Sequence, residues 1–372
     1  MLSLVSYQAN IFNKQIRDNL DLKTWLDFYK LMNDPWLAIS DRTKQFNFPI
    51  RTYIPDNFLI PAFKESNLTF SNCALMRAQE IISHQECTDL PIHILYSGGI
   101  DSSVVLSSFI ELLGVNEASK RIKIQMNQSS IDENPEMWYK FIRPHFTLID
   151  SNYTYNDKDY GNWIYVTGEL NDQLFGAEIQ QVYEKFSGIN SLNEKINLEK
   201  LVKFFTECRK MDKKSAMVWA AMLIDNMSTC PNHNNSMWDL FWWYNFTWKW
   251  IYVYFRFFLF FRNQGSIDKK WMTDNYFPFF NTSEFQLWSM NSKEDKHHSD
   301  WNSYKVTAKE FVCKTHGSAD YMKKVKRRSL PSLIHLKPKI NAIDKNFNIM
   351  EHVNFNDVFN LNNSVIQYEK NF

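Results

Sequence analysis

Residues 94–103 constrain the fold of this chain more than any other stretch, because an apolar strand passes through two glycines directly into a helix. Gly98 and Gly99 allow a tight turn and let the backbone approach a ligand closely. The helix expected at residues 102–113 directs unpaired N–H groups and the positive end of its dipole toward that turn. The pattern predicts an α/β fold in which the turn holds a phosphate group; a turn without any ligand is the alternative.

The polar side chains of this turn suit a polyphosphate with its metal. Ser97, Ser102 and Ser103 supply hydroxyl donors for phosphate oxygens, and the Asp101 carboxylate suits Mg2+. The lysine-bearing G-x-x-x-x-G-K-[ST] loop is absent, so the expected site differs from a kinase-type phosphate site.

Strands and helices alternate around this turn. Apolar patterns predict strands at residues 91–96, 121–126, 146–149 and 163–166, and helices at residues 73–84, 102–113 and 134–142. Such alternation favours a doubly wound, mostly parallel sheet with helices on both faces and a ligand at the carboxyl ends of the strands. The pattern becomes largely helical between Gly176 and Met290. We expect three parts: a leading region of unclear role (1–71), a main domain (72–340) and a polar tail (341–372) that is loosely ordered after Phe347.

A second polar motif, residues 167–176, follows the predicted strand at 163–166. Its carboxylates should therefore lie beside the first turn. Asp172 could share a magnesium ion with Asp101, and Glu169 could orient or deprotonate an attacking amine. A solvated loop with a helix-capping aspartate is the alternative.

Together the two motifs resemble the ATP pyrophosphatases that carry the PP-loop, S-G-G-x-D-S. The second motif is similar to the S-G-E-G-x-D-E-x-F-G-G-Y segment of asparagine synthetases and β-lactam synthetases. The positions that match are Gly168, Glu169, Asp172, Phe175 and Gly176. Residues 277–281 resemble that family's V-P-F-L-D turn, and residues 321–330 resemble its Y-L-P-x-x-(x)-x-R-x-K stretch. The resemblance extends over about residues 72–340.

The resemblance implies an ATP-dependent amide ligase that adenylylates a carboxylate, releases pyrophosphate and then transfers the acyl group to an amine or ammonia. Conversion of aspartate to asparagine is one such reaction. ATP and Mg2+ are the implied cofactors. The implied site residues are Asp101 and Asp172 for the metal, Glu169 and Lys326 for catalysis, and, for the nucleotide, Leu95, Ser97, Gly98, Gly99, Asp101, Ser102, Ser103, Met126 and Gly168. The basic residues near Lys326 could equally form a solvated helix face or an anion patch.

Several positions depart from the family pattern. Leu2 stands where the family's glutaminase domain requires a cysteine after removal of the initiator methionine, so we expect no glutamine hydrolysis by that route. Ammonia or an amine would come from solvent, from a separate partner or from the substrate. Gln173 replaces the family's second acidic residue, Asn281 its aspartate and Ala177 a glycine, and these changes bear on which acceptor the site takes.

The charge balance gives no reason to expect a nucleic-acid or membrane partner, since 42 Lys and Arg oppose 41 Asp and Glu. The aromatic stretch at residues 238–261 contains Asp239, Asn245, Lys249 and Arg256, which favours a buried helix or helix pair over a membrane span. No charged-then-apolar leader opens the sequence, and the five cysteines follow no disulfide spacing, so we expect a cytoplasmic protein. The sequence leaves open whether the chain forms a homodimer.

Two other function classes stay open at this point. A PP-loop enzyme that modifies a nucleobase or tRNA is one, although no cysteine pair or basic RNA-binding module accompanies the loop. A catalytically silent nucleotide-binding or interaction protein is the other, in keeping with the altered second motif. The scattered histidines and cysteines do not follow a zinc spacing. The tryptophans at 242, 243, 248 and 250 fit a core better than a stacking platform.

Overall fold

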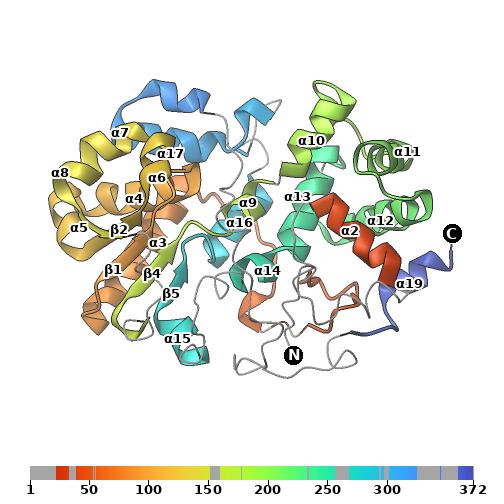
Figure 1. Cartoon of the computed structure of the whole chain (residues 1–372), viewed down its shortest axis with the longest axis horizontal. Helices are drawn as coiled ribbons and strands as arrows, with labels where there is room; N and C mark the ends of the chain where they lie inside the picture. The colour runs from red at the N-terminus through yellow and green to blue at the C-terminus, as the bar shows by residue number, and fades with distance from the viewer. Residues whose placement is uncertain are drawn as a thin grey trace.

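A computed structural model of the chain describes residues 22–32, 39–52, 54, 56–150, 160–176, 178–232, 234–255, 268–292, 295–296, 301–324, 344 and 359–371. In Figure 1 a parallel sheet with its helices occupies the left half, and a group of helices occupies the right half. Helices α9 and α16 lie between the two halves.

Five parallel strands form the sheet, in the spatial order β3-β2-β1-β4-β5. Their bounds are β1 Ile92–Leu95, β2 Ile122–Met126, β3 Thr147–Asp150, β4 Ile164–Thr167 and β5 Tyr276–Pro278. The chain moves from β1 outward to β3 and then returns to the other side of β1 as β4. Leu95 pairs with Gln125 of β2 and Thr167 of β4, so the loops that follow these strands leave the same edge. The strand order reverses between β1 and β4, and α/β proteins bind ligands outside the carboxyl ends of strands at such a reversal.

The α-helices surround the sheet and build the second half. They are α2 Lys23–Met32, α3 Phe70–Thr88, α4 Ile100–Leu113, α5 Val115–Arg121, α6 Gln128–Glu133, α7 Pro135–Met137, α8 Arg143–His145, α9 Asn171–Phe175, α10 Glu178–Ser187, α11 Leu198–Lys203, α12 Lys213–Asn226, α13 Met237–Trp248, α14 Trp250–Phe255, α15 Lys269–Asp274, α16 Ser283–Asn291, α17 Val306–His316 and α19 Ser364–Glu369. Helix α4 packs against both α3 and α17, which fixes the turn that precedes it.

The four strands expected from the sequence are present within one or two residues of their predicted positions. The expected helix at 134–142 is instead the short α7 followed by a π-helical turn, Trp138–Ile142. Helices α5 and α6 and strand β5 were not predicted. Strand β5 has only three residues, and it joins the sheet because Tyr276 and Phe277 pair with Tyr165 and Val166 of β4.

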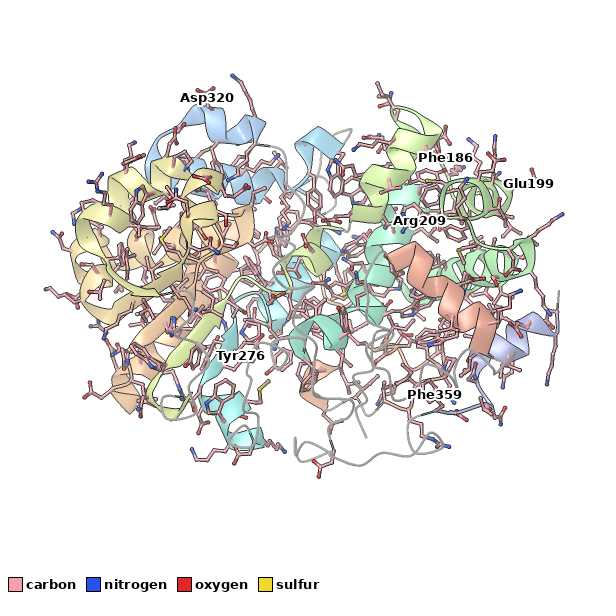
Figure 2. The ribbon with its side chains drawn as sticks, in the orientation of Figure 1. Phe186, Glu199, Arg209, Tyr276, Asp320 and Phe359 are labelled. Carbon is pink, nitrogen blue, oxygen red and sulfur yellow. The ribbon has the colours of Figure 1, made fainter. Side chains whose placement is uncertain are left out.

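The aromatic stretch forms two buried helices, α13 and α14, as the sequence predicted for the part that the structure describes. Trp243 and Trp248 are almost fully buried, and both belong to the core. Tyr276, labelled in Figure 2, connects the sheet to this pair, since its hydroxyl donates to the Tyr254 carbonyl at 3.4 Å. Over the described ranges, no helix has both the length and the apolar character that a membrane crossing requires. All five cysteines are free.

Segments from both ends of the chain pack on helix α12. The ring of Phe28 in α2 lies 4.1 Å from that of Trp219, and Val365 in α19 is fully buried. The two end segments also meet each other, because Ile50 bridges to Phe359, which Figure 2 labels at the base of the helical half. Residues 359–371 are therefore packed, in contrast to the loosely ordered tail that the polar composition after Phe347 suggested, and residues 348–358 of that tail lie outside the described residues.

Candidate functional site

The turn after β1 has the form that the sequence predicted for a phosphate cradle. Gly98 lies at φ +76°, and helix α4 begins directly after Gly99. No side chain caps α4, so the N–H groups of its first turn remain available to a ligand. The Ser102 hydroxyl lies 3.1 Å from that of Ser97 and accepts a bond from the Ser97 N–H at 3.2 Å, which closes the turn.

Two glycines are required here because other parts of the backbone come too close for a side chain. A Cβ on Gly98 would lie 2.2 Å from the carbonyl oxygen of Ser130 in α6. A Cβ on Gly168, in the loop after β4, would lie 2.9 Å from the Ser102 nitrogen and 3.1 Å from the Asp101 Cβ. The second motif therefore lies against the first turn, as their places after β4 and β1 predicted.

The loop after β4 leads into the short helix α9 through an unusual backbone conformation. Leu170 lies in the left-handed region at φ 78° and is buried. The next residue, Asn171, is fully buried, and its side-chain amide donates to Asp101 Oδ1 at 2.7 Å. The strained turn thus brings a hydrogen-bond donor of the second motif onto the carboxylate of the first.

The carboxylates of Asp101 and Asp172 meet at one cation, the ammonium group of Lys305. This group lies 2.7 Å from Asp172 Oδ1 and also contacts Asp101 Oδ1. The Lys305 side chain is 0% exposed, whereas those of Asp101 and Asp172 are 25% and 32% exposed. The two acidic groups therefore keep an open side toward solvent while the lysine closes the buried side.

Tyr304 donates to the carboxylate of Asp172, and Asn245 donates to the backbone of the same helix. The Tyr304 hydroxyl lies 2.9 Å from Asp172 Oδ1 and 3.1 Å from the Gly176 carbonyl. Burial, followed by the charges of Asp172 and Asp101, raises the pKa of Tyr304 well above its ordinary value, so the hydroxyl stays protonated and donates. The buried Asn245 of α13 donates to the carbonyls of Asp172 and Gly176 at 2.7 and 3.0 Å.

Two residues that differ from the family pattern, Gln173 and Asn281, form hydrogen bonds with other side chains of the protein. Gln173 is buried and donates to Asn245 Oδ1 at 3.2 Å, so it faces α13. Asn281 accepts a hydrogen bond from the Trp250 indole at 3.0 Å. Ala177 lies outside the described residues.

A second lysine contacts the glycine turn itself. Lys324 follows the helical turn Ala319–Lys323 (η12) and donates to the Gly98 carbonyl at 3.2 Å and to that of Glu133. Its ammonium group is 3.4 Å from the Glu133 carboxylate and 5.0 Å from the ring centre of the buried Tyr321. Lys324 thus contacts the glycine turn through the Gly98 carbonyl, whereas Lys305 contacts the neighbouring Asp101 carboxylate.

Comparison with known proteins adds nothing to this geometry. No family model, no curated protein and no solved structure matches the chain. The resemblance to asparagine synthetases therefore depends on the short motifs and on the arrangement described above.

The remaining predicted residues are placed as follows. Leu95 and Met126 are the last residues of β1 and β2, so they lie at the same edge of the sheet as the glycine turn. Glu169 lies half-buried in the loop between Gly168 and Leu170. Ser103 is fully buried and accepts a hydrogen bond from Asn134 at 3.0 Å, so it supports the turn from inside. Lys326 lies outside the described residues.

The oxygen atoms at this site fit a hard cation such as Mg2+. Besides the two carboxylates, the side-chain oxygen of the buried Asn171 has no hydrogen-bond partner among the described residues. Over the same ranges, no three His, Cys, Asp or Glu side chains gather around a point where a metal could bind. A magnesium ion here would therefore have two carboxylate ligands and take the others from phosphate, water or an amide oxygen.

Sequence reasoning missed Lys305, Tyr304 and Asn171. Lys305 opens helix α17, at the end where helices favour acidic residues. A lysine is unusual at that position, and its backbone lies in the left-handed region at φ 60°. The positive charge can be read from the sequence, but the backbone conformation cannot.

Proposed function

We propose that this chain is an ATP-dependent amide ligase of the PP-loop type, with a doubly wound sheet like that of asparagine synthetases. It would form AMP and pyrophosphate while joining a carboxylate to an amine or ammonia. The observation that carries this proposal is the convergence of Asp101 and Asp172, from two separate motifs, beside the glycine turn at the reversal of strand order. A helix-capping aspartate in a solvated loop would not explain this convergence.

The turn would bind the β- and γ-phosphates of ATP. The uncapped N–H groups of α4 and the hydroxyls of Ser97 and Ser102 are suitable donors for phosphate oxygens. The adenosine would then extend along the strand ends at Leu95 and Met126. Mg2+, when bound between Asp101 and Asp172, would neutralise the charge of the departing pyrophosphate.

Two bond exchanges make up the proposed reaction. A carboxylate oxygen of the substrate attacks the α-phosphorus, the bond between that phosphorus and the bridging oxygen breaks, and pyrophosphate leaves with the electron pair. An amine then attacks the acyl carbon, the C–N bond forms, the bond between the acyl carbon and the phosphate oxygen breaks, and AMP leaves with that electron pair. Glu169 would accept the proton that the amine loses, since it lies in the loop beside Asp101. The acid and the amine that react are open, with aspartate and ammonia as one pair.

The two lysines would supply the positive charge that this chemistry needs. Lys305 is close to both carboxylates, and Lys324 fixes the Gly98 carbonyl, so both lie near the expected phosphates. Lys324 lies two residues before Lys326, the position that the resemblance indicated. A cation at this place would stabilise negative charge on phosphate and on the tetrahedral intermediate.

An ATP–pyrophosphate exchange assay tests the proposal. Radioactive pyrophosphate should enter ATP when the protein is given ATP, Mg2+ and the correct member of a panel of carboxylic acids that includes aspartate. Asp101→Asn should abolish the exchange. Glu199→Gln, which neutralises an exposed carboxylate on α11, is the matched control and should retain it. Lack of exchange with every acid, in folded protein that binds ATP, would contradict the proposal.

A silent nucleotide-binding protein is the second candidate. Two observations favour it. The ammonium group of Lys305 already balances the charge of the two carboxylates. Gln173 and Asn281 form hydrogen bonds with Asn245 and Trp250 inside the protein. This candidate predicts that ATP binds and raises the melting temperature, while neither exchange nor an acyl-adenylate is detected by mass spectrometry.

A further inference from the structure

We infer that Lys305 fills the cation position between Asp101 and Asp172 in the nucleotide-free chain, so that the site rejects free divalent metal and accepts it only together with a nucleotide. This inference rests on the proposed function. It identifies the ligand as a metal–nucleoside triphosphate complex, and it assigns to Lys305 the role of excluding the uncomplexed metal.

The charges and burial of the three groups carry the first step. The Lys305 side chain is fully buried, and its ammonium group forms ion pairs with both carboxylates. A divalent ion between the same carboxylates would place two positive centres within a few ångströms of each other, where they repel. A free metal ion would therefore have to displace a fully buried ammonium group from the two anionic partners that compensate its burial.

The protein ligands of the metal carry the second step. Asp101 and Asp172 supply two carboxylates, and over the described ranges no larger group of metal-binding side chains exists. Mg2+ binds weakly to so few protein ligands and commonly takes the rest from substrate phosphates. Phosphate would supply these ligands and would also accept the ammonium group of Lys305 as it leaves the carboxylates.

The backbone at Lys305 carries the third step. Its φ of 60° is unfavourable for a lysine, and its N–H donates to the Lys296 carbonyl at 3.1 Å. Helix α17, which begins at the next residue, packs against α4, which begins at the glycine turn. The position of the Lys305 backbone is thus fixed relative to the expected phosphates, while the four-carbon side chain is long enough to turn from one anion to another.

Binding of Mn2+, followed by electron paramagnetic resonance and by calorimetry, tests this inference without any turnover. The wild-type chain should not bind Mn2+ alone at millimolar concentration, and should bind it when the non-hydrolysable α,β-methylene analogue of ATP is present. Lys305→Met should bind Mn2+ alone at least tenfold more tightly than the wild type. Lys305→Arg, which keeps the charge, should exclude it as the wild type does.

Equal binding of Mn2+ alone to wild type and Lys305→Met would overturn the inference. Tight binding of Mn2+ alone to the wild type would overturn it even if Lys305→Met does not fold. These outcomes are separate from failure of the proposed function. A chain that does not bind the nucleotide analogue contradicts the proposed function, whereas the comparison of wild type and Lys305→Met without nucleotide still decides whether the lysine excludes metal.

Discussion

The ammonium group of Lys305 lies 2.7 Å from the carboxylate of Asp172, and this ion pair joins the N-terminal ends of helices α17 and α9. The same ammonium group contacts Asp101 at the start of α4. Three helices from distant parts of the chain thus share one charge cluster at the carboxyl edge of the sheet. The acidic pair is organised before any ligand arrives, because the protein supplies the opposing charge itself.

Removal of one carboxylate should destabilise the fold. Asp172→Asn leaves the buried lysine with one anionic partner, and we expect a loss of about 1–3 kcal/mol, below the loss for a fully buried pair because Asp172 is partly exposed. Chemical denaturation measures this loss. The double variant Asp172→Asn with Lys305→Met should recover part of it, and Glu199→Gln should change stability by less than about 0.5 kcal/mol. Equal stability of Asp172→Asn and wild type would show that the pair contributes nothing.

Gly168 should not tolerate a methyl group. In Gly168→Ala the Cβ would press on the backbone of Asp101 and Ser102, which cannot move as a flexible side chain does. We expect about 1–3 kcal/mol of destabilisation and loss of ATP binding. The control is Gly161→Ala, where nothing lies within 4 Å. Normal ATP affinity of Gly168→Ala would contradict the close approach of the two motifs.

Alanine substitutions at Gly98 and Gly114 distinguish the cost of backbone strain at positive φ from the cost of steric contact with the added Cβ. Both have positive φ, at 76° and 74°, but a Cβ on Gly98 would collide with the Ser130 carbonyl while one on Gly114 would meet nothing within 4 Å. Each alanine variant should lose about 1 kcal/mol or more from backbone strain. Gly98→Ala should lose clearly more by thermal denaturation. Similar losses for the two variants would mean that crowding at Ser130 is easily relieved.

Lys324 should affect ATP binding through the glycine turn. Lys324→Met removes the ammonium group that fixes the Gly98 carbonyl, and we expect about tenfold weaker binding of ATP by calorimetry, about 1.4 kcal/mol. Lys323→Met is the matched control, because Lys323 is 83% exposed and pairs with Asp320 at the surface. Unchanged affinity in Lys324→Met would remove this lysine from the site.

His93 should make stability depend on pH. Burial lowers the pKa of this histidine in the centre of β1 to about 4, below its ordinary value of 6.5. The unfolded chain therefore binds a proton between pH 6.5 and 4 while the folded chain does not, so stability falls as the pH falls through this window. The loss should be about 3 kcal/mol in total.

Denaturation curves of wild type and His93→Phe at several pH values measure this effect. The aromatic substitution keeps a ring beside Trp163 and Tyr165, and it should remove the extra slope between pH 4 and 6.5. Parallel curves for the two proteins would mean that His93 is not the group responsible.

The sequence predicted the elements that are formed by residues close together in the chain. The apolar strands and the two glycines of the first turn are consecutive in sequence, so β1, its turn and α4 could be anticipated together with the neighbouring loop after β4. Lys305 could not, since it reaches Asp101 only through the packing of α17 on α4. Strand β5 is too short to show a period, and its partner β4 lies far away in sequence.

The end of the chain illustrates the same limit. Asparagines suggested disorder there, yet Asn363 caps α19 by accepting from the Ile366 N–H at 3.2 Å. Polar composition alone does not distinguish a cap from a flexible tail. The role of the leading region was also unreadable, because its contacts are with helices more than a hundred residues away, such as the hydrogen bond from the Trp219 indole to the Thr24 carbonyl.

The contact between the end segments has a consequence for synthesis. Backbone bonds join Asn360 to Pro49 and Ser364 to Asn47, and α19 completes the cover of α12. On the ribosome, the sheet half can assemble before residues 359–371 emerge, but α12 keeps an apolar side uncovered until α19 is available to pack on it. A chain that lacks α19 would expose that side in the cell, where chaperones and proteases recognise such surfaces.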